Sequence, residues 1–144
     1  MKKAWVRSFG ALILLVSLLA GFTLRRTAAA EVNGINSNED RLAFLESIGR
    51  RAESTPLSAR YVTLPEELSP VLEAYNRLQL AQGFDLRPYC GKELEQYSYK
   101  AAEDYLGETL YYTLYIYRGR IVGADAHTAS LNGAMMGLLR TEEN

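Results

Sequence analysis

The spacing of hydrophobic and polar positions changes twice along the chain. Residues 8–24, SFGALILLVSLLAGFTL, are apolar and uncharged, and they follow the basic start MKKAWVR. In the middle of the chain, apolar residues recur every three or four positions, a period that predicts helices over 38–48 and 70–82. From Lys92 the period becomes two, which predicts strands over 92–101, 108–117 and 120–127.

Capping residues support both helices. Ser37 or Asn38 can cap the first, and Gly49 stands where such a helix ends. Ser69 and Pro70 form a cap and first-turn pair for the second. Its apolar residues make one stripe that is wide enough to lie on a sheet: Val71, Leu72, Tyr75 and Leu78.

Three further segments complete the predicted fold. ARYVTLP reads as a short strand, FDLRPYCGK is apolar enough to fold back on the core, and TASLNGAMMGLLR reads as a short helix capped by Thr128. We therefore predict one α+β domain over residues 38–140, with two to three helices packed on a three- to four-stranded, mainly antiparallel sheet. Residues 31–37 are predicted to be a linker, and residues 141–144 a tail.

The segment YYTLYIYRGRIVGADAH predicts a hairpin with a two-residue turn at Arg118 and Gly119. This turn places Tyr117 opposite Arg120 and fixes the remaining pairs. The tyrosines then gather mostly on one side, opposite the small residues Ala124 and Ala126, where they can fill space or form an aromatic platform for a ligand. The possible ligand contacts are Tyr97, Tyr99, Tyr111, Tyr115 and Tyr117.

The same register places Tyr112, Asp125 and His127 together on the other face. A carboxylate beside an imidazole and a phenol can carry out acid–base chemistry or form a structural hydrogen-bonded cluster. The parts of a catalytic triad seldom come from one short run, and His127 is the only histidine of the chain. We therefore predict no catalytic, metal-binding or cofactor-binding residue here.

The start of the chain predicts export. Residues 1–30 read either as a signal peptide, cut after Ala30, or as an N-terminal membrane anchor that contacts the membrane through residues 8–24. Ala28 and Ala30 favour cleavage, whereas Arg25 and Arg26 favour retention. Both readings place the domain outside the cytoplasm, secreted or anchored to the outer face of the cytoplasmic membrane. The single Cys90 then implies a domain with no internal disulfide.

Charge narrows the choice of partner. Five of the 16 Lys and Arg residues precede residue 31, so the remaining 11 face all 17 acidic residues, a net charge of −6 for residues 31–144. Such a domain repels the phosphate backbone, which excludes nucleic acid as a partner. We expect a non-catalytic binding or regulatory module of the cell envelope, with an unknown protein, peptide or glycan as its ligand. The alternatives are a small hydrolase using Asp125 and His127, or a structural subunit of an envelope complex.

The order of several motifs resembles an uncharacterised bacterial family, domain of unknown function 4830. The motifs are FLESIG, LPEELSPVLEAYNRLQLAQGFDLRPYCGK, YSYK, YRGRIVGAD and SLNGAMMGL, over about residues 41–139. The sequence departs from the family pattern at Arg50, where the family tends to carry an aromatic residue. The resemblance implies a small exported or membrane-anchored domain and a shared role of FDLRPYCGK and the hairpin in the fold. It implies no activity and no site residues.

Overall fold

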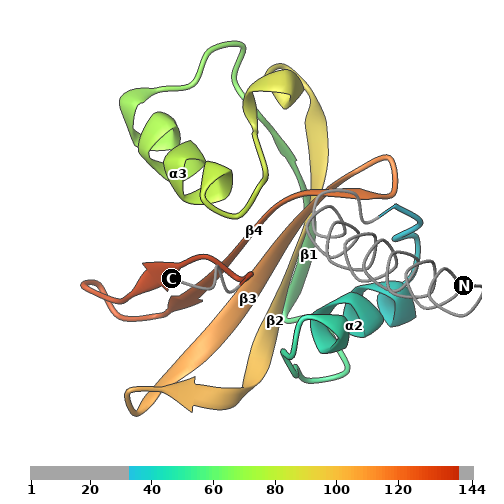
Figure 1. The fold of residues 1–144 in the computed structure, drawn as a ribbon, viewed down its shortest axis with the longest axis vertical. Helices are drawn as coiled ribbons and strands as arrows, with labels where there is room; N and C mark the ends of the chain where they lie inside the picture. Colours follow the sequence, from blue (N-terminus) through green and yellow to red (C-terminus); the bar gives the residue numbers. More distant parts are fainter. Residues whose placement is uncertain (1–32, 140–144) are drawn as a thin grey trace, which may run out of the picture. The chain divides into compact units, whose positions relative to one another are not determined.

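A computed structural model describes residues 33–139, and the predicted export segment and C-terminal tail lie outside these residues. Within them, an α+β fold is built on one antiparallel sheet, as predicted (Figure 1). The helices are α2 (Asn38–Ser47), α3 (Pro70–Leu80) and the short 3-10 helix η1 (Arg87–Tyr89). The strands lie in sequence order: β1 (Ser58–Thr63), β2 (Glu93–Tyr105), β3 (Glu108–Tyr117), β4 (Arg120–Thr128) and β5 (Met135–Met136). The prediction of three or four strands was therefore too low, since the sheet has five.

The predicted caps begin both helices. The Ser37 hydroxyl accepts a hydrogen bond from the Asp40 backbone N–H, while the Asp40 carboxylate accepts from the Ser37 backbone N–H, so the pair forms a capping box. In α3 the Ser69 hydroxyl accepts from the Leu72 N–H, and Pro70 occupies the first turn. Because these bonds are local, the sequence was sufficient to place the helix starts.

The segment after β4 is the fifth strand and not the predicted helix. Thr128 ends β4, and its N–H donates to the Ala134 carbonyl across a turn that returns the chain to the sheet. Met135 and Met136 then pair with His127 and Ala126. Two glycines in this segment lower its helix propensity, so pairing with the open edge of β4 prevails.

The helices lie on opposite sides of the sheet (Figure 1). The main core forms on the α2 side, where buried Phe44 and Leu45 of α2 pack in one cluster with Tyr99, Tyr112 and Leu114 of the sheet. A smaller cluster on the other side contains residues from FDLRPYCGK, from strands β2 and β4 and from the position just after β1: Leu86, Leu94, Val122 and Leu64. Phe84 and Leu86 are buried, so this connection folds back on the core as predicted.

Tyr75 of the predicted apolar stripe packs against the smaller cluster, but the orientation of α3 otherwise differs from the prediction. Its buried residues are the polar Asn76 and Gln79, whereas Val71 of the predicted core-facing stripe is 78% exposed. The Gln79 Oε1 accepts from the Ala124 N–H at 2.9 Å, and the Nε2 of Gln82, just beyond the helix, donates to the Ala124 carbonyl at 3.0 Å. These amides bind the backbone of β4 as a neighbouring strand would, which protects the edge of the sheet.

Two tight hairpins join β2 to β3 and β3 to β4. Leu106 and Gly107 have φ values of 52° and 79°, and Arg118 and Gly119 have values of 49° and 73°. Positive φ at both turn residues is the pattern that matches the twist of paired strands. The two-residue turn at Arg118 and Gly119 is thus confirmed.

Leu106 is expected to be a suboptimal turn residue, because its side chain is 87% exposed and a leucine at positive φ is strained. Leu106→Asn should raise the free energy of unfolding by about 0.5–1 kcal/mol, since asparagine tolerates the left-handed conformation. Chemical denaturation measures the change. Thr109→Asn, next to the turn, is the control and should give no gain; a similar gain there would show that the turn conformation is not the cause.

Candidate functional site: a cleft beside α3 and a polar line on the sheet

A bulge in β4 decides which side chains meet on the sheet. Tyr117 pairs with Arg120 and Ile116 with Ile121, as the turn predicted, but Tyr115 pairs with Gly123. Val122 is therefore an additional residue in β4, and every later pair is shifted by one. A shift of one residue moves side chains to the opposite face of a strand.

This shift separates the predicted polar cluster. Asp125 and His127 lie on the α3 side of the sheet, opposite Thr113 and Tyr111. Tyr112 lies on the α2 side, fully buried, and its hydroxyl donates to the Glu103 carboxylate. Burial, with this hydrogen bond, raises the pKa of Tyr112 to about 12. Tyr112 is therefore a core residue away from Asp125, and the predicted grouping of the three was wrong.

The five predicted ligand-contacting tyrosines also divide between the two faces. Tyr97 pairs with Leu114 and Tyr99 with Tyr112, so both lie on the α2 side. There the Arg41 guanidinium lies 3.6 Å from the centre of the Tyr97 ring and donates to the Tyr99 hydroxyl at 2.7 Å. The remaining three, Tyr111, Tyr115 and Tyr117, lie on the α3 side. The five residues therefore do not form one platform.

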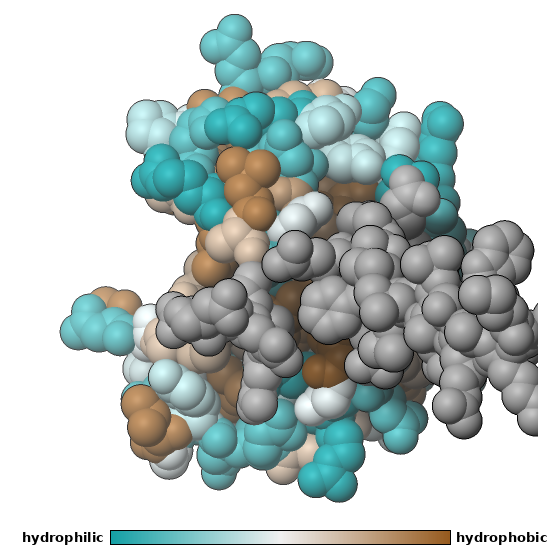
Figure 2. Space-filling model, in the orientation of Figure 1, coloured by the Kyte–Doolittle hydropathy of each residue, from teal (hydrophilic) through white to brown (hydrophobic). Residues whose placement is uncertain are grey.

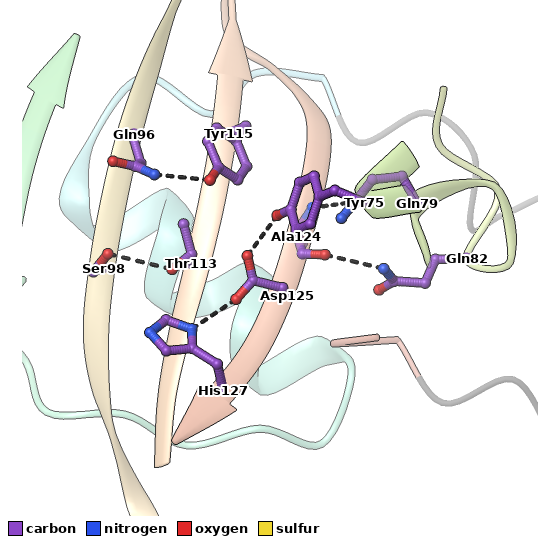
Figure 3. A network of polar contacts seen from close by, with 10 residues as sticks. All are labelled: Tyr75, Gln79, Gln82, Gln96, Ser98, Thr113, Tyr115, Ala124, Asp125 and His127. Carbon is purple, nitrogen blue, oxygen red and sulfur yellow. Dashed lines mark hydrogen bonds and ion pairs between the residues drawn. The ribbon is translucent and has the colours of Figure 1, made fainter. Parts of the chain in front are cut away.

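A line of hydrogen bonds links α3 to Asp125 and His127 (Figure 3). The Tyr75 hydroxyl donates to Asp125 Oδ2 at 2.5 Å, and Asp125 Oδ1 lies 2.7 Å from His127 Nδ1. Asp125 is 2% exposed, so these two partners satisfy a carboxylate that water barely reaches. Tyr75 was assigned to the helix stripe by its spacing, and no signal in the sequence connected it to Asp125, 50 positions away.

Burial and the shared carboxylate shift the ionisation of this line. The hydrogen bond to Asp125 raises the pKa of His127 above its ordinary value. Burial, together with the Asp125 charge, strongly raises the pKa of Tyr75. Tyr75 is therefore a neutral donor at physiological pH, whereas His127 can carry a proton.

An open apolar cleft of about 600 Å³ lies beside α3. Leu72, Tyr75 and Leu78 of α3 line it together with sheet residues, while the amide side chain of Gln79 bonds to β4. The rest of its lining comes from neighbouring segments: Leu64, Leu86, Leu94, Tyr115 and Met135, with Val71 and Ala74 of the helix. Figure 2 shows hydrophobic side chains at the surface around the helix.

Among residues 33–139, no group of three or more His, Cys, Asp or Glu side chains could hold a metal ion. The same residues contain no helix that is long and apolar enough to cross a membrane. Asp125 and His127 form an acid–imidazole pair, and the second oxygen of Asp125 accepts from the Tyr75 hydroxyl. The cleft beside α3, open and lined mainly by apolar side chains, has the features of a ligand-binding site.

Comparisons with known proteins add no relative: no family model, no curated protein and no solved structure matches the chain. The resemblance to domain of unknown function 4830 accordingly stays a prediction.

Proposed function

We propose that this domain is a non-catalytic binding module at the cell envelope, and that the cleft beside α3 receives apolar side chains of a protein or peptide partner. The observation that carries the proposal is that the apolar residues of α3 line a cleft that is open to solvent. A helix of a globular domain normally buries its apolar face. Here Asn76 and Gln79 take the buried positions, and Leu72 and Leu78 line a cleft that is open to solvent.

The lining supports a peptide over a glycan as the ligand. A sugar needs several hydrogen-bonding groups, whereas the surface of the cleft is almost entirely apolar. Its volume of about 600 Å³ can hold more than one side chain. An amphipathic helix that presents bulky apolar residues at i, i+3 and i+4 fits an open groove of this kind. The predicted export of the chain places such a partner outside the cytoplasm.

The test compares two serine substitutions in α3. Leu72 lines the cleft, whereas Leu80, 44% exposed, does not. Leu72→Ser should weaken binding of the dye 1-anilinonaphthalene-8-sulfonate about fivefold or more, because about 1 kcal/mol of apolar contact is lost. Leu80→Ser has the same effect on helix propensity and should bind the dye as wild type does.

A displayed peptide library extends the test to the proposed partner. Peptides selected on the full chain should carry clustered bulky apolar residues, and should bind wild type and Leu80→Ser but not Leu72→Ser. Selection of polar peptides, or equal binding by all three proteins, would contradict the proposal.

The Asp125–His127 hydrogen bond is the observation that favours a hydrolase as the second candidate, since an orienting acid and a base are two parts of a triad. A hydrolase should cleave an activated ester such as p-nitrophenyl acetate and lose that activity in His127→Gln. Equal rates of ester hydrolysis in wild type and His127→Gln would contradict a hydrolase that uses Asp125 and His127.

A further inference from the structure

A second, smaller pocket of about 200 Å³ lies at the far end of the same sheet face, next to His127. It is lined by Leu57, Ser58, Ser98, Tyr111, His127 and Ala129. None of these residues lines the cleft beside α3, so an inference about this pocket does not depend on the function proposed for that cleft.

The orientation of the imidazole is fixed from two sides. Asp125 holds His127 Nδ1, and the Tyr111 ring stacks on the imidazole with the ring centres 5.8 Å apart. The other ring nitrogen, Nε2, therefore points away from Asp125 and towards β2, which carries Ser98 (Figure 3). The side chain of His127 is 31% exposed, so a ligand in the pocket can reach it.

The hydrogen bond to Asp125 also decides what Nε2 can do. A carboxylate on Nδ1 keeps the proton on that nitrogen, so the neutral ring has an accepting Nε2. Only the protonated ring donates from Nε2. The lining contains the hydroxyls of Ser58, Ser98 and Tyr111 and no acidic side chain. The Ser98 Oγ lies 3.3 Å from Thr113 Oγ1, and either can be the donor, so Ser98 can donate to a ligand while it accepts from Thr113. A protonated His127 and these hydroxyls would present donors to one small ligand group.

The charged groups around His127 are compatible with an anionic ligand. Asp125 of β4 is already occupied by Tyr75 of α3 and by His127 itself. On β2, Lys100 is the register partner of Tyr111, which in turn pairs with His127 on β4. Lys100 is paired with Glu53 at 3.0 Å, and Asp104 acts on the same ammonium group. Glu108 accepts from the hydroxyl of Ser130, which lies beyond the end of β4. The carboxylates named here thus have basic or hydroxyl partners.

We propose that the pocket beside His127 binds a carboxylate, which accepts from the protonated imidazole at Nε2 and from a serine hydroxyl, and that binding takes up one proton at a pH where the free imidazole is neutral. A carboxylate has two accepting oxygens in one plane, which suits one charged donor and one hydroxyl donor. The carboxylate could belong to a peptide C-terminus or to an acidic side chain.

Because His127 is the only histidine of the chain, its imidazole protons give unambiguous signals in a proton NMR spectrum of the full chain. Acetate is the probe. It should shift these signals in a saturable way at pH 6 and raise the midpoint of the His127 titration, because carboxylate binding and protonation favour each other. Acetamide and chloride, at the same concentration and ionic strength, should do neither.

Two further measurements separate a site from general charge attraction. The dissociation constant for acetate should rise about tenfold for each pH unit above the midpoint of the His127 titration, because the protonated ring becomes ten times rarer. Ser98→Ala should weaken it about fivefold, through loss of one hydrogen bond, while Ser54→Ala, outside the pocket, should leave it unchanged. Comparing the affinity for leucine, which offers a main-chain carboxylate, with that for acetyl-aspartate amide, which offers only a side-chain carboxylate, would then distinguish a peptide C-terminus from an acidic side chain.

Several results would overturn the proposal. Equal shifts with acetamide, tighter acetate binding at higher pH, or no shift with acetate at all would each show that the imidazole does not act as a charged donor. An acetate response that is the same in wild type and Ser98→Ala would show nonspecific attraction and no built pocket. If Ser98→Ala disturbs the fold, the pH dependence of acetate binding by wild type decides alone.

Discussion

Asp125→Ala should lower the free energy of unfolding by about 2–4 kcal/mol, the largest single effect that we expect outside the apolar core. The substitution leaves the half-buried Tyr75 hydroxyl and the Nδ1 of His127 without their shared acceptor. Removing one partner of a buried polar group costs its desolvation as well as the hydrogen bond. Urea denaturation at constant pH measures the loss, and Asp104→Ala, at an exposed position of β2, should change stability by less than about 0.5 kcal/mol.

The same hydrogen bond predicts how stability depends on pH. Asp125 raises the pKa of His127 in the folded state, so the protonated ring is favoured there over the unfolded chain. This contribution is fully present below the ordinary histidine pKa, and it is lost as the pH rises through the higher pKa of the folded state. Wild-type stability should therefore decline as the pH rises above about 6.5, the ordinary histidine pKa. In His127→Gln that decline should be absent; a parallel decline in both proteins would assign it to other groups.

Gln79→Met should lower the free energy of unfolding by about 1–3 kcal/mol. Methionine has nearly the same length and shape, but it cannot accept a hydrogen bond as well as the amide oxygen does. The Ala124 N–H, which donates to Gln79 at 2.9 Å, would be left buried without a partner. Arg77→Met, at an exposed position of the same helix, is the matched control and should have little effect on stability.

Hydrogen exchange makes this prediction specific to one atom. The Ala124 amide is bonded to a side chain of α3, so it should exchange slowly in wild type and faster in Gln79→Met. The neighbouring amides that bond to β3 should change less. Unchanged protection of Ala124 in Gln79→Met would mean that the edge of β4 is closed by some other contact.

The features that the sequence predicted correctly depend on contacts between residues close in the chain. The caps at Ser37 and Ser69 bond to backbone groups within three residues, and the turn at Arg118 and Gly119 is set by the φ of its own two residues. The alternation of polar and apolar residues likewise predicted the long strands, because it reflects the pleat. The return of FDLRPYCGK to the core followed from its apolar side chains.

The predictions that failed depend on partners far away in the chain. Nothing within RIVGADAH marks Val122 as the additional residue of a bulge, because its side chain would alternate as well in a regular strand. The short β5 exists only because β4 offers it an edge. Asn76, Gln79 and Gln82 do recur every three residues, a polar stripe that could have been recognised. Its role in the fold, however, depends on the Ala124 N–H and carbonyl, with which Gln79 and Gln82 form hydrogen bonds.

By itself, the amino-acid sequence determined the fold class, where the two helices begin, and the tight turn that joins β3 to β4, since local backbone preferences are sufficient for each. Only the tertiary structure decided that α3 turns its amides to the sheet and leaves an apolar cleft open, and that Asp125 and His127 join Tyr75 and not Tyr112. The physical reason is the same in both cases. Which face of an element is buried depends on the hydrogen bonds and surfaces that its neighbours leave unsatisfied, and those neighbours are distant in the chain.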